Sequence, residues 1–255
     1  MKTLGCASFV YNAIEQDYNF RETIACMQEL ADHVIVLDAG STDGTQEHLL
    51  KLGDKKTTII LCAPEEWRNQ QGKEKLSYFS NMAISRLETD YQFYLQMDEI
   101  IHEDSFPLIR EAIEYGFESY MVKRHNLFYD PWHQLNVPQE RKPCSTEVLR
   151  LAKTKYRCYD DAESLACNEV CFNFMENIHI FHMGYVRDPK KHLVKIRHMI
   201  NEVFRLEPER RIEGIEEFDP SRFFATEDVI PIQSDLPKFI KEWVKERYPN
   251  GPRSL

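Results

Sequence analysis

The sequence predicts an α/β protein with a Rossmann-like, mostly parallel central sheet flanked by helices, and three observations lead to this prediction. Short apolar runs alternate with amphipathic segments over the first hundred residues, a pattern typical of parallel strands joined by crossover helices. The apolar run at 33–37 is of the kind found in strands covered on both faces. Small polar and acidic residues follow the strands, where ligands bind in open α/β sheets.

The first hundred residues supply the regular part of this fold. Apolar and β-branched runs predict strands, and apolar residues recurring every three or four positions predict the helices between them. The expected strands are 3–10, 33–37, 57–62 and 91–97, and the expected helices are 17–31, 45–52 and 76–87. After the third strand, Pro64 and a polar stretch at 68–72 interrupt the alternation of strands and helices.

The second half is less regular. We expect a helix at 106–115, strands at 119–123, 147–151 and 179–185, and a long loop over a site at 126–143. Asp188 and Pro189 open another helix as its N-cap and first residue, and an amphipathic helix at 236–247 ends the tail. These elements predict one domain at 1–205, with halves at 1–105 and 106–205, and a C-terminal helical extension at 206–255.

Composition excludes several classes of protein. The net charge of −10 argues against a general nucleic-acid binder, which needs a basic surface. No apolar run approaches the roughly 18 residues of a membrane-spanning helix. The seven cysteines lack the spacing of a disulfide scaffold, so reduced thiols in the cytoplasm are the default. A zinc site is the alternative for part of this set, without a Cys-x-x-Cys pair to support it: Cys158, Cys167, Cys171, His179 and His182.

The stretch at 91–101 carries the clearest chemical signal. Its aromatic and aliphatic first part predicts a buried strand, and Asp98 and Glu99 stand where that strand would emerge. Two carboxylates about 4 Å apart repel by roughly 4 kcal/mol at an effective dielectric constant of about 20. A divalent cation would relieve this repulsion, and oxygen ligands suit Mg²⁺ or Mn²⁺. A solvated acidic turn is the alternative.

Three motifs in order resemble the family 2 glycosyltransferases, which use nucleotide sugars and have the GT-A fold. They are Tyr11-Asn12, the stretch Asp38-Ala39-Gly40-Ser41-Thr42-Asp43-Gly44-Thr45, and Asp98-Glu99. The resemblance is clear over 3–105 and continues more weakly to about residue 200. It is greatest with the small bacterial enzymes related to lipopolysaccharide-core and peptide glycosyltransferases. The usual Asp-x-Asp is here Gln96-Met97-Asp98-Glu99, with a single aspartate.

The resemblance implies a nucleoside-diphosphate sugar as donor, UDP-linked by expectation, and a glycan or other hydroxyl as acceptor. It implies nucleotide-binding roles for Tyr11, Asn12, Asp38, Ser41, Asp43 and Gln96. It also implies that Asp98, with Glu99 and His182, holds Mn²⁺ or Mg²⁺ against the diphosphate. Helix capping is the alternative for Ser41. A basic cluster of Arg187, Lys190, Lys191 and Lys195 offers further phosphate contacts near a helix N-terminus.

An inverting transfer needs a base that takes the proton of the acceptor hydroxyl. Glu163 is the first choice, because Glu163-Ser164-Leu165 resembles a His-Glu-Ser-Leu-like segment of relatives, although Ala162 replaces the histidine. Asp161 is the second choice, and Asp160 is a further rival. Three ring-bearing residues are expected on the acceptor side: Trp67, Trp132 and His133.

Two other functions compete with this one. A nucleotidyltransferase can have a similar fold, but the expected glycine- and lysine-rich N-terminal loop is missing. An inactive GT-A-like module that only binds nucleotide sugars is the other, and Asp38, Asp43 and Asp98 count against it. The sequence leaves room for peripheral membrane contact and gives no oligomeric state.

Overall fold

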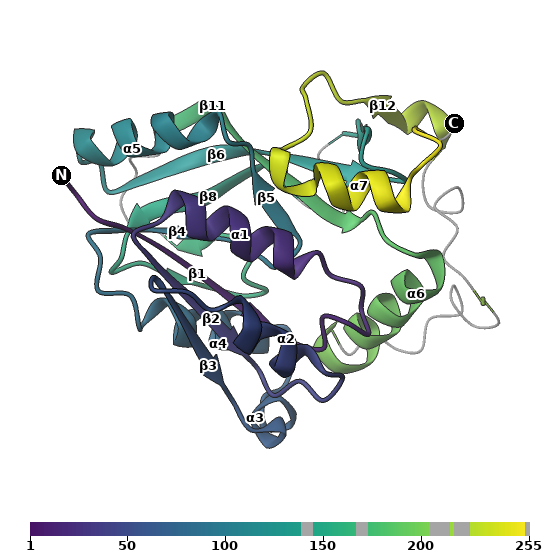
Figure 1. Ribbon diagram of the computed structural model, residues 1–255, viewed down its shortest axis with the longest axis horizontal. Coiled ribbons are helices and arrows are strands. Elements are labelled where there is room, and N and C mark those ends of the chain that lie inside the picture. Colours follow the sequence, from purple (N-terminus) through teal and green to yellow (C-terminus); the bar gives the residue numbers. More distant parts are fainter. Residues whose placement is uncertain (139–144, 167–172, 205–214, 217–224, 253–255) are drawn as a thin grey trace.

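The computed structural model describes residues 1–138, 145–166, 173–204, 215–216 and 225–252. Within them the predicted α/β architecture is confirmed: a large central sheet runs through the molecule and helices cover both of its faces (Figure 1). The strand order along its main path is β12-β7-β6-β8-β4-β1-β2-β3. None of the described helices combines the length and apolar character that crossing a bilayer requires.

One side of the sheet is parallel. It contains β3 (Thr57–Leu61), β2 (His33–Asp38), β1 (Leu4–Val10) and β4 (Tyr91–Tyr94), in that spatial order. All neighbours in this set are parallel, with Val10 opposite Asp38 at the carboxyl ends of β1 and β2. This half matches the prediction from alternating strands and helices, because crossover helices leave successive strands pointing the same way.

The other side of the sheet is mixed. Strand β8 (Glu147–Lys153) lies antiparallel between β4 and β6 (Ser119–Phe128). Strand β11 (Asn173–Tyr185) runs parallel to β6 and antiparallel to β5 (Glu99–Ile101). Two short strands, β7 (His133–Leu135) and β12 (Val229–Pro231), complete this edge. The strands of 106–205 therefore join the same sheet as those of 1–105.

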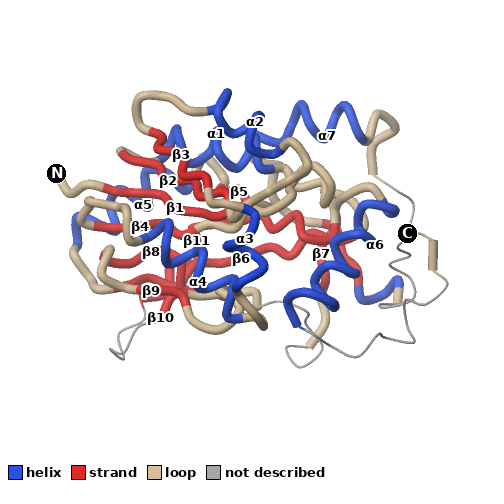
Figure 2. The backbone as a smooth tube through the Cα atoms, turned by 90° about the horizontal axis from the view of Figure 1, so that it is seen from below, coloured by secondary structure: helices blue, strands red, loops and turns tan. Residues whose placement is uncertain are grey.

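Helices form a layer on each face of the sheet (Figure 2). One layer holds α1 (Phe20–Leu30), α2 (Thr45–Leu52), α5 (Ser105–Tyr115) and α7 (Lys241–Arg247), whose apolar residues share one core. The opposite layer holds α3 (Pro64–Asn69), α4 (Glu74–Ile84) and the small sheet of β9 (Arg157–Cys158) and β10 (Leu165–Ala166). The helix α6 (Pro189–His198) lies beyond the strand ends (Figure 1).

Several elements differ from the sequence-based expectation. The strand predicted at 91–97 ends at Tyr94, and a turn separates it from β5. The interruption after the third strand is the helix α3, because Pro64 occupies its first turn, where a missing N–H costs nothing. The loop expected at 126–143 contains the end of β6 and all of β7, and its part at 139–144 lies outside the described residues.

The helix after Asp188 begins as predicted. The Asp188 side chain accepts hydrogen bonds from Lys190 N and Lys191 N, and Pro189 is the first helical residue. The helix then changes at Met199 into a π-helical segment, η2 (Met199–Phe204). Such segments are rare in proteins, and those that occur often lie at functional sites. The amphipathic tail helix is confirmed as a short 3₁₀ turn, η5 (Lys238–Ile240), followed by α7.

Candidate functional site

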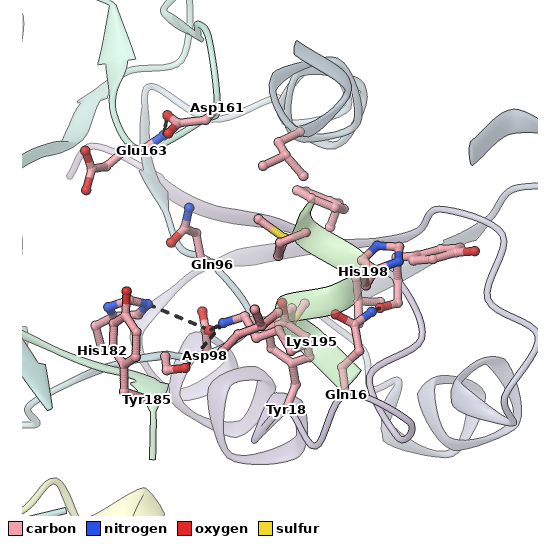
Figure 3. Close-up of a pocket in the computed structure, with 18 of the residues that line it drawn as sticks. Gln16, Tyr18, Gln96, Asp98, Asp161, Glu163, His182, Tyr185, Lys195 and His198 are labelled. Carbon is pink, nitrogen blue, oxygen red and sulfur yellow. Dashed lines mark hydrogen bonds and ion pairs between the residues drawn. The ribbon is translucent and has the colours of Figure 1, made fainter. Parts of the chain in front are cut away.

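A cavity of about 390 Å³ lies beyond the carboxyl ends of β1 and β4, and α6 with η2 forms its far wall. Its lining comes from the end of β1, the loop before α1, α3 with α4, the turn after β4, Arg124 on β6, the acidic loop at 161–163, and the segment from 182 to 204. Figure 3 shows how the labelled residues surround it. This is the edge of the sheet where the sequence predicted a site.

One end of the cavity is aromatic and apolar. The ring of Tyr11 stacks on Trp67, with the centroids 4.0 Å apart and the planes inclined by 9°. The His198 ring lies 5.4 Å from Tyr11 and 5.5 Å from Trp67, and Trp67 donates a hydrogen bond from Nε1 to Glu202. Burial raises the pKa of Tyr11 to about 12, so its hydroxyl stays protonated. Trp67, which the sequence predicts on the acceptor side, lies at this aromatic end.

The other end of the cavity is charged and centres on Asp98. This carboxylate is 3% exposed, and its Oδ2 lies 3.0 Å from Lys195 Nζ, 3.1 Å from Arg187 Nη2 and 3.7 Å from His182 Nε2. Figure 3 shows Lys195 and His182 approaching Asp98. Burial alone would raise the pKa of Asp98, but the positive charges of Lys195 and Arg187 hold it well below its usual range.

His182 is held in place by its own neighbours. Its Nδ1 lies 3.0 Å from Asn126 Oδ1, and a Cβ on Gly184 would approach the imidazole ring to 2.5 Å. Glycine at position 184 therefore makes room for this ring orientation. Burial lowers the pKa of His182 well below its usual value, so the ring is neutral at pH 7.

Glu99 faces away from the cavity although it follows Asp98 directly. Its side chain is fully buried, and its Oε1 accepts from Arg150 Nη2 at 2.6 Å and from Arg124 Nη1 at 3.2 Å. Its Oε2 accepts a hydrogen bond from Gln96 N at 2.9 Å. The expected repulsion between Asp98 and Glu99 is thus met by two separate sets of cations.

The donor set around Asp98 does not fit a divalent cation well. Mg²⁺ requires an octahedral shell of oxygen ligands, yet both Glu99 oxygens are engaged elsewhere. A doubly charged ion about 4 Å from Lys195 or Arg187 would be repelled by each with roughly 8 kcal/mol at an effective dielectric constant of about 20. The part of the chain that the structure describes contains no group of three or more His, Cys, Asp or Glu side chains arranged for a metal. The metal stays a prediction from the sequence.

The acidic loop at 160–163 forms a third side of the cavity, and Gln96 Nε2 reaches Ala162 O at 3.4 Å. Glu163 lines the cavity, and its carboxylate binds Arg124, Ser145 N at 2.7 Å and Ser145 Oγ at 3.0 Å. Burial would raise the pKa of Glu163, but Arg124 and these hydrogen bonds lower it. Glu163 is therefore ionised and well bound, which makes it a weak base.

Asp161 has the opposite environment. It lines the same cavity, and its Oδ1 accepts a hydrogen bond from Glu163 N at 3.2 Å. Burial, helped by Glu163 and Asp160, raises the pKa of Asp161, and Lys73 opposes this. Asp160 does not line the cavity and pairs with Lys73 at 2.7 Å. Of the three acidic residues, Asp161 has the environment of a proton acceptor.

The stretch 38–45, the most specific motif of the sequence, ties two loops together. Ser41 Oγ accepts from Asn12 N at 2.8 Å, Asn12 Oδ1 accepts from Thr42 N at 2.9 Å, and Asp43 Oδ2 accepts from Glu15 N at 2.7 Å. Asp43 also binds the backbone N and the hydroxyl of Thr45. The side chains predicted to bind the nucleotide thus bind neighbouring backbone groups here.

Asp38 shapes the turn at the start of this motif. Its Oδ1 accepts from Gly40 N at 2.9 Å, Ser41 N at 2.8 Å and Gln46 Nε2 at 2.8 Å. Gly40 has φ +93°, and a Cβ there would lie 2.5 Å from Ala63 O, so glycine is required. None of Asn12, Asp38, Ser41 and Asp43 lines the large cavity, although Asn12 lines a smaller one of about 230 Å³ beside Tyr11. Their nucleotide roles stay predictions.

The other expected residues lie outside the large cavity. Trp132 packs edge-on against Tyr248 at 5.9 Å, and His133 Nδ1 lies 2.7 Å from Asp130 Oδ1. Lys191 donates to Ile14 O at 2.8 Å. For the zinc alternative, His179 pairs with His125 at 3.0 Å, whereas Cys167 and Cys171 lie outside the described residues.

Sequence reasoning missed several cavity residues: Gln16, Tyr18, Arg124, Tyr185, His192 and His198. Tyr18 matters most, since Arg187 and Lys195 lie 4.7 Å and 5.0 Å from its ring centroid. These residues follow no motif, and the topology alone brings them to the strand ends. Lys195 was singled out within a basic cluster, but nothing local distinguished it from Lys190.

Among the comparisons with known proteins, only the one with solved structures finds similar proteins. No protein-family model and no curated protein matches the chain. Among solved structures, residues 1–349 of S. aureus TarS in complex with UDP-GlcNAc match with a TM-score of 0.51 and 15% identity, over 79% of this chain and 67% of that one. The same fragment with UDP gives a TM-score of 0.49 at 12% identity.

The chain spans 40% of the length of a longer S. aureus TarS structure, which it matches with a TM-score of 0.49 at 13% identity. The likeness to the complex with UDP-GlcNAc, at 15% identity, shows the fold and does not by itself show an activity. The mixed, partly parallel sheet between two helical layers, with its cavity beyond the strand ends, is the fold of the GT-A glycosyltransferases.

Proposed function

We propose that this chain is a glycosyltransferase that transfers a sugar from a nucleoside-diphosphate sugar, UDP-linked, to a hydroxyl acceptor. The observation that carries the proposal is the order of surfaces in one cavity: an aromatic end, a cationic end at Asp98 and Lys195, and a carboxylate side at Asp161. The matching TarS fragment is a complex with UDP-GlcNAc, which supports the choice of donor.

The cavity gives each part of the donor a place. The base would pack against the apolar wall formed by Val10, Tyr11 and Leu76. The diphosphate would lie at Lys195, where positive charge faces the cavity. The sugar would then extend toward Gln96 and the acidic loop, on the side of the cavity where Asp161 lies (Figure 3).

The proposed reaction is a direct displacement with inversion at the anomeric carbon. Asp161 accepts the proton of the acceptor hydroxyl while the oxygen of that hydroxyl bonds to the anomeric carbon. The bond between the anomeric carbon and the diphosphate oxygen breaks in the same step. An α-linked donor therefore gives a β-linked product and free nucleoside diphosphate. We prefer Asp161 over Glu163 as base because Arg124 and Ser145 already engage the Glu163 carboxylate. The acceptor, expected to be a glycan, and a cytoplasmic location remain predictions.

The test is binding and turnover with defined donors. Calorimetry should be done separately with UDP, GDP and dTDP and with the glucose and N-acetylglucosamine derivatives of each. We expect a uridine nucleotide to bind most tightly. With UDP-sugar and a panel of glycans, free UDP should accumulate, and NMR of the product should show an inverted anomer.

Each contrary result has a distinct meaning. Binding without release of UDP, for every acceptor, would favour the binding module. Release of pyrophosphate from a nucleoside triphosphate would favour the nucleotidyltransferase. Absence of binding by all these nucleotides would contradict the proposed function.

A further inference from the structure

The geometry points to a diphosphate subsite that needs no divalent cation: Lys195 binds the diphosphate of the donor, Arg187 adds charge behind it, and Asp98 holds both cations in place. This inference rests on the proposed function and concerns the same cavity. It differs from the sequence-based expectation, in which Asp98 is the ligand of Mn²⁺ or Mg²⁺.

The first argument is the balance of charge. Asp98 carries one negative charge, and Lys195 and Arg187, both within 3.1 Å of its Oδ2, carry two positive charges. The three fixed charges of Asp98, Lys195 and Arg187 therefore sum to +1 before any ligand binds. A diphosphate brings negative charge to this net positive cluster, whereas a divalent cation adds to the positive charge.

The second argument is which groups reach the cavity. Lys195 lines it and keeps 15% of its side chain exposed, and its flexible ammonium can move from Asp98 to a phosphate oxygen. Arg187 is buried behind Asp98, donates from Nη1 to Gln16 O at 2.6 Å, and cannot follow a ligand. Lys195 is therefore the residue that contacts phosphate, and Arg187 is a positioning residue that acts through Asp98.

The third argument is an unused donor. Arg187 Nε is buried and has no hydrogen-bond partner among the described residues. The Arg187 and Lys195 cations both lie over the face of the Tyr18 ring, which stabilises them by cation–π interaction. The two cations thus carry more positive charge than the single Asp98 carboxylate neutralises, which favours an anion at Lys195.

The test is UDP binding to the full chain by calorimetry, first after dialysis against EDTA and then with Mn²⁺ or Mg²⁺ added. We expect the dissociation constant for UDP to agree within about threefold under the three conditions. Lys195→Met should weaken binding at least tenfold in EDTA, and Lys195→Arg should restore most of it. Lys190→Met is the matched control, because Lys190 is exposed on the same helix and does not line the cavity.

The outcomes separate this inference from the proposed function. UDP binding that requires Mn²⁺ or Mg²⁺ would overturn the metal-free subsite and leave the proposed function standing. Equal binding by Lys195→Met and Lys190→Met, both with the melting temperature of the unmodified chain, would also overturn it. Absence of UDP binding under every condition would instead contradict the proposed function, and this inference with it.

Discussion

Two clusters of carboxylates and cations form around the adjacent residues Asp98 and Glu99 after β4, and they differ in access to solvent. The pocket cluster contains Asp98, His182, Arg187 and Lys195, and the core cluster contains Glu99, Arg124, Arg150 and Glu163. Most of the pocket cluster lines the cavity, namely Asp98, His182 and Lys195. In the core cluster, Arg124 and Glu163 also reach it, whereas Glu99 and Arg150 are fully buried.

This difference shows that adjacent acidic residues can have unrelated roles. Asp98 and Glu99 are neighbours in the chain, but Glu99 begins β5, and its fully buried side chain pairs with Arg124 and Arg150. A fully buried ion pair fixes structure, because any unpaired member would be a desolvated charge. A cluster that opens on a cavity can exchange one partner for a ligand. The predictions below test this division.

The largest expected effect concerns the base, which should be the acidic residue outside both clusters. Asp161→Asn should slow transfer by about 10²–10⁴-fold, the usual share of general-base catalysis, with donor binding unchanged. Glu163→Gln should slow transfer less and lower the melting temperature, since Arg124 loses its partner. Initial rates of UDP release and thermal melts of both variants measure this. Normal turnover in Asp161→Asn would return the assignment to Glu163.

The core cluster should be essential for stability. Glu99→Gln removes the charge that pairs with Arg124 and Arg150, and breaking a buried pair in this way costs about 3–5 kcal/mol of unfolding free energy. Urea unfolding followed by circular dichroism gives this number. A loss below that of the equivalent change at Asp98 would contradict the proposed division of roles.

The pocket cluster should tolerate the same change better. Asp98→Asn should cost about 1–3 kcal/mol of unfolding free energy, because the Lys195 side chain can reach the cavity when its partner is lost. UDP should still bind to this variant in EDTA, since the change removes a negative charge beside the diphosphate. Loss of UDP binding in a folded Asp98→Asn protein would show that Asp98 contacts the ligand, directly or through a metal.

The smallest effect is a pH dependence of the transfer rate. Asp161 must be ionised to accept a proton, and its pKa is raised by burial and by its neighbours Glu163 and Asp160, against the opposing charge of Lys73. The transfer rate should therefore be low below this raised pKa and increase as the pH rises through it. This increase should occur at a higher pH than it would for an ordinary aspartate. Rate profiles of the unmodified chain and of Asp161→Asn test this, because the residual rate of the variant should lack that step.

The fold was largely predictable because its signals are local. The apolar run at 33–37 and the Asp188-Pro189 helix start each depend on a few consecutive residues, and β2 and α6 confirm both. The strand at 91–97 was predicted too long, since its apolar composition continues through the turn after Tyr94. Composition cannot separate a strand residue from a buried turn residue when both face the core.

The candidate site was predictable only in part. The sequence by itself determined that acidic residues would follow β4 and that a basic helix would follow Asp188. Only the tertiary structure decided that Lys195 and Arg187, about ninety residues further along the chain, would meet Asp98, and that Glu99 would meet two arginines instead. Charge partners depend on which elements pack together, and residue spacing carries no record of that. A motif thus locates the edge of the sheet where chemistry occurs, and packing decides which of its carboxylates faces the ligand.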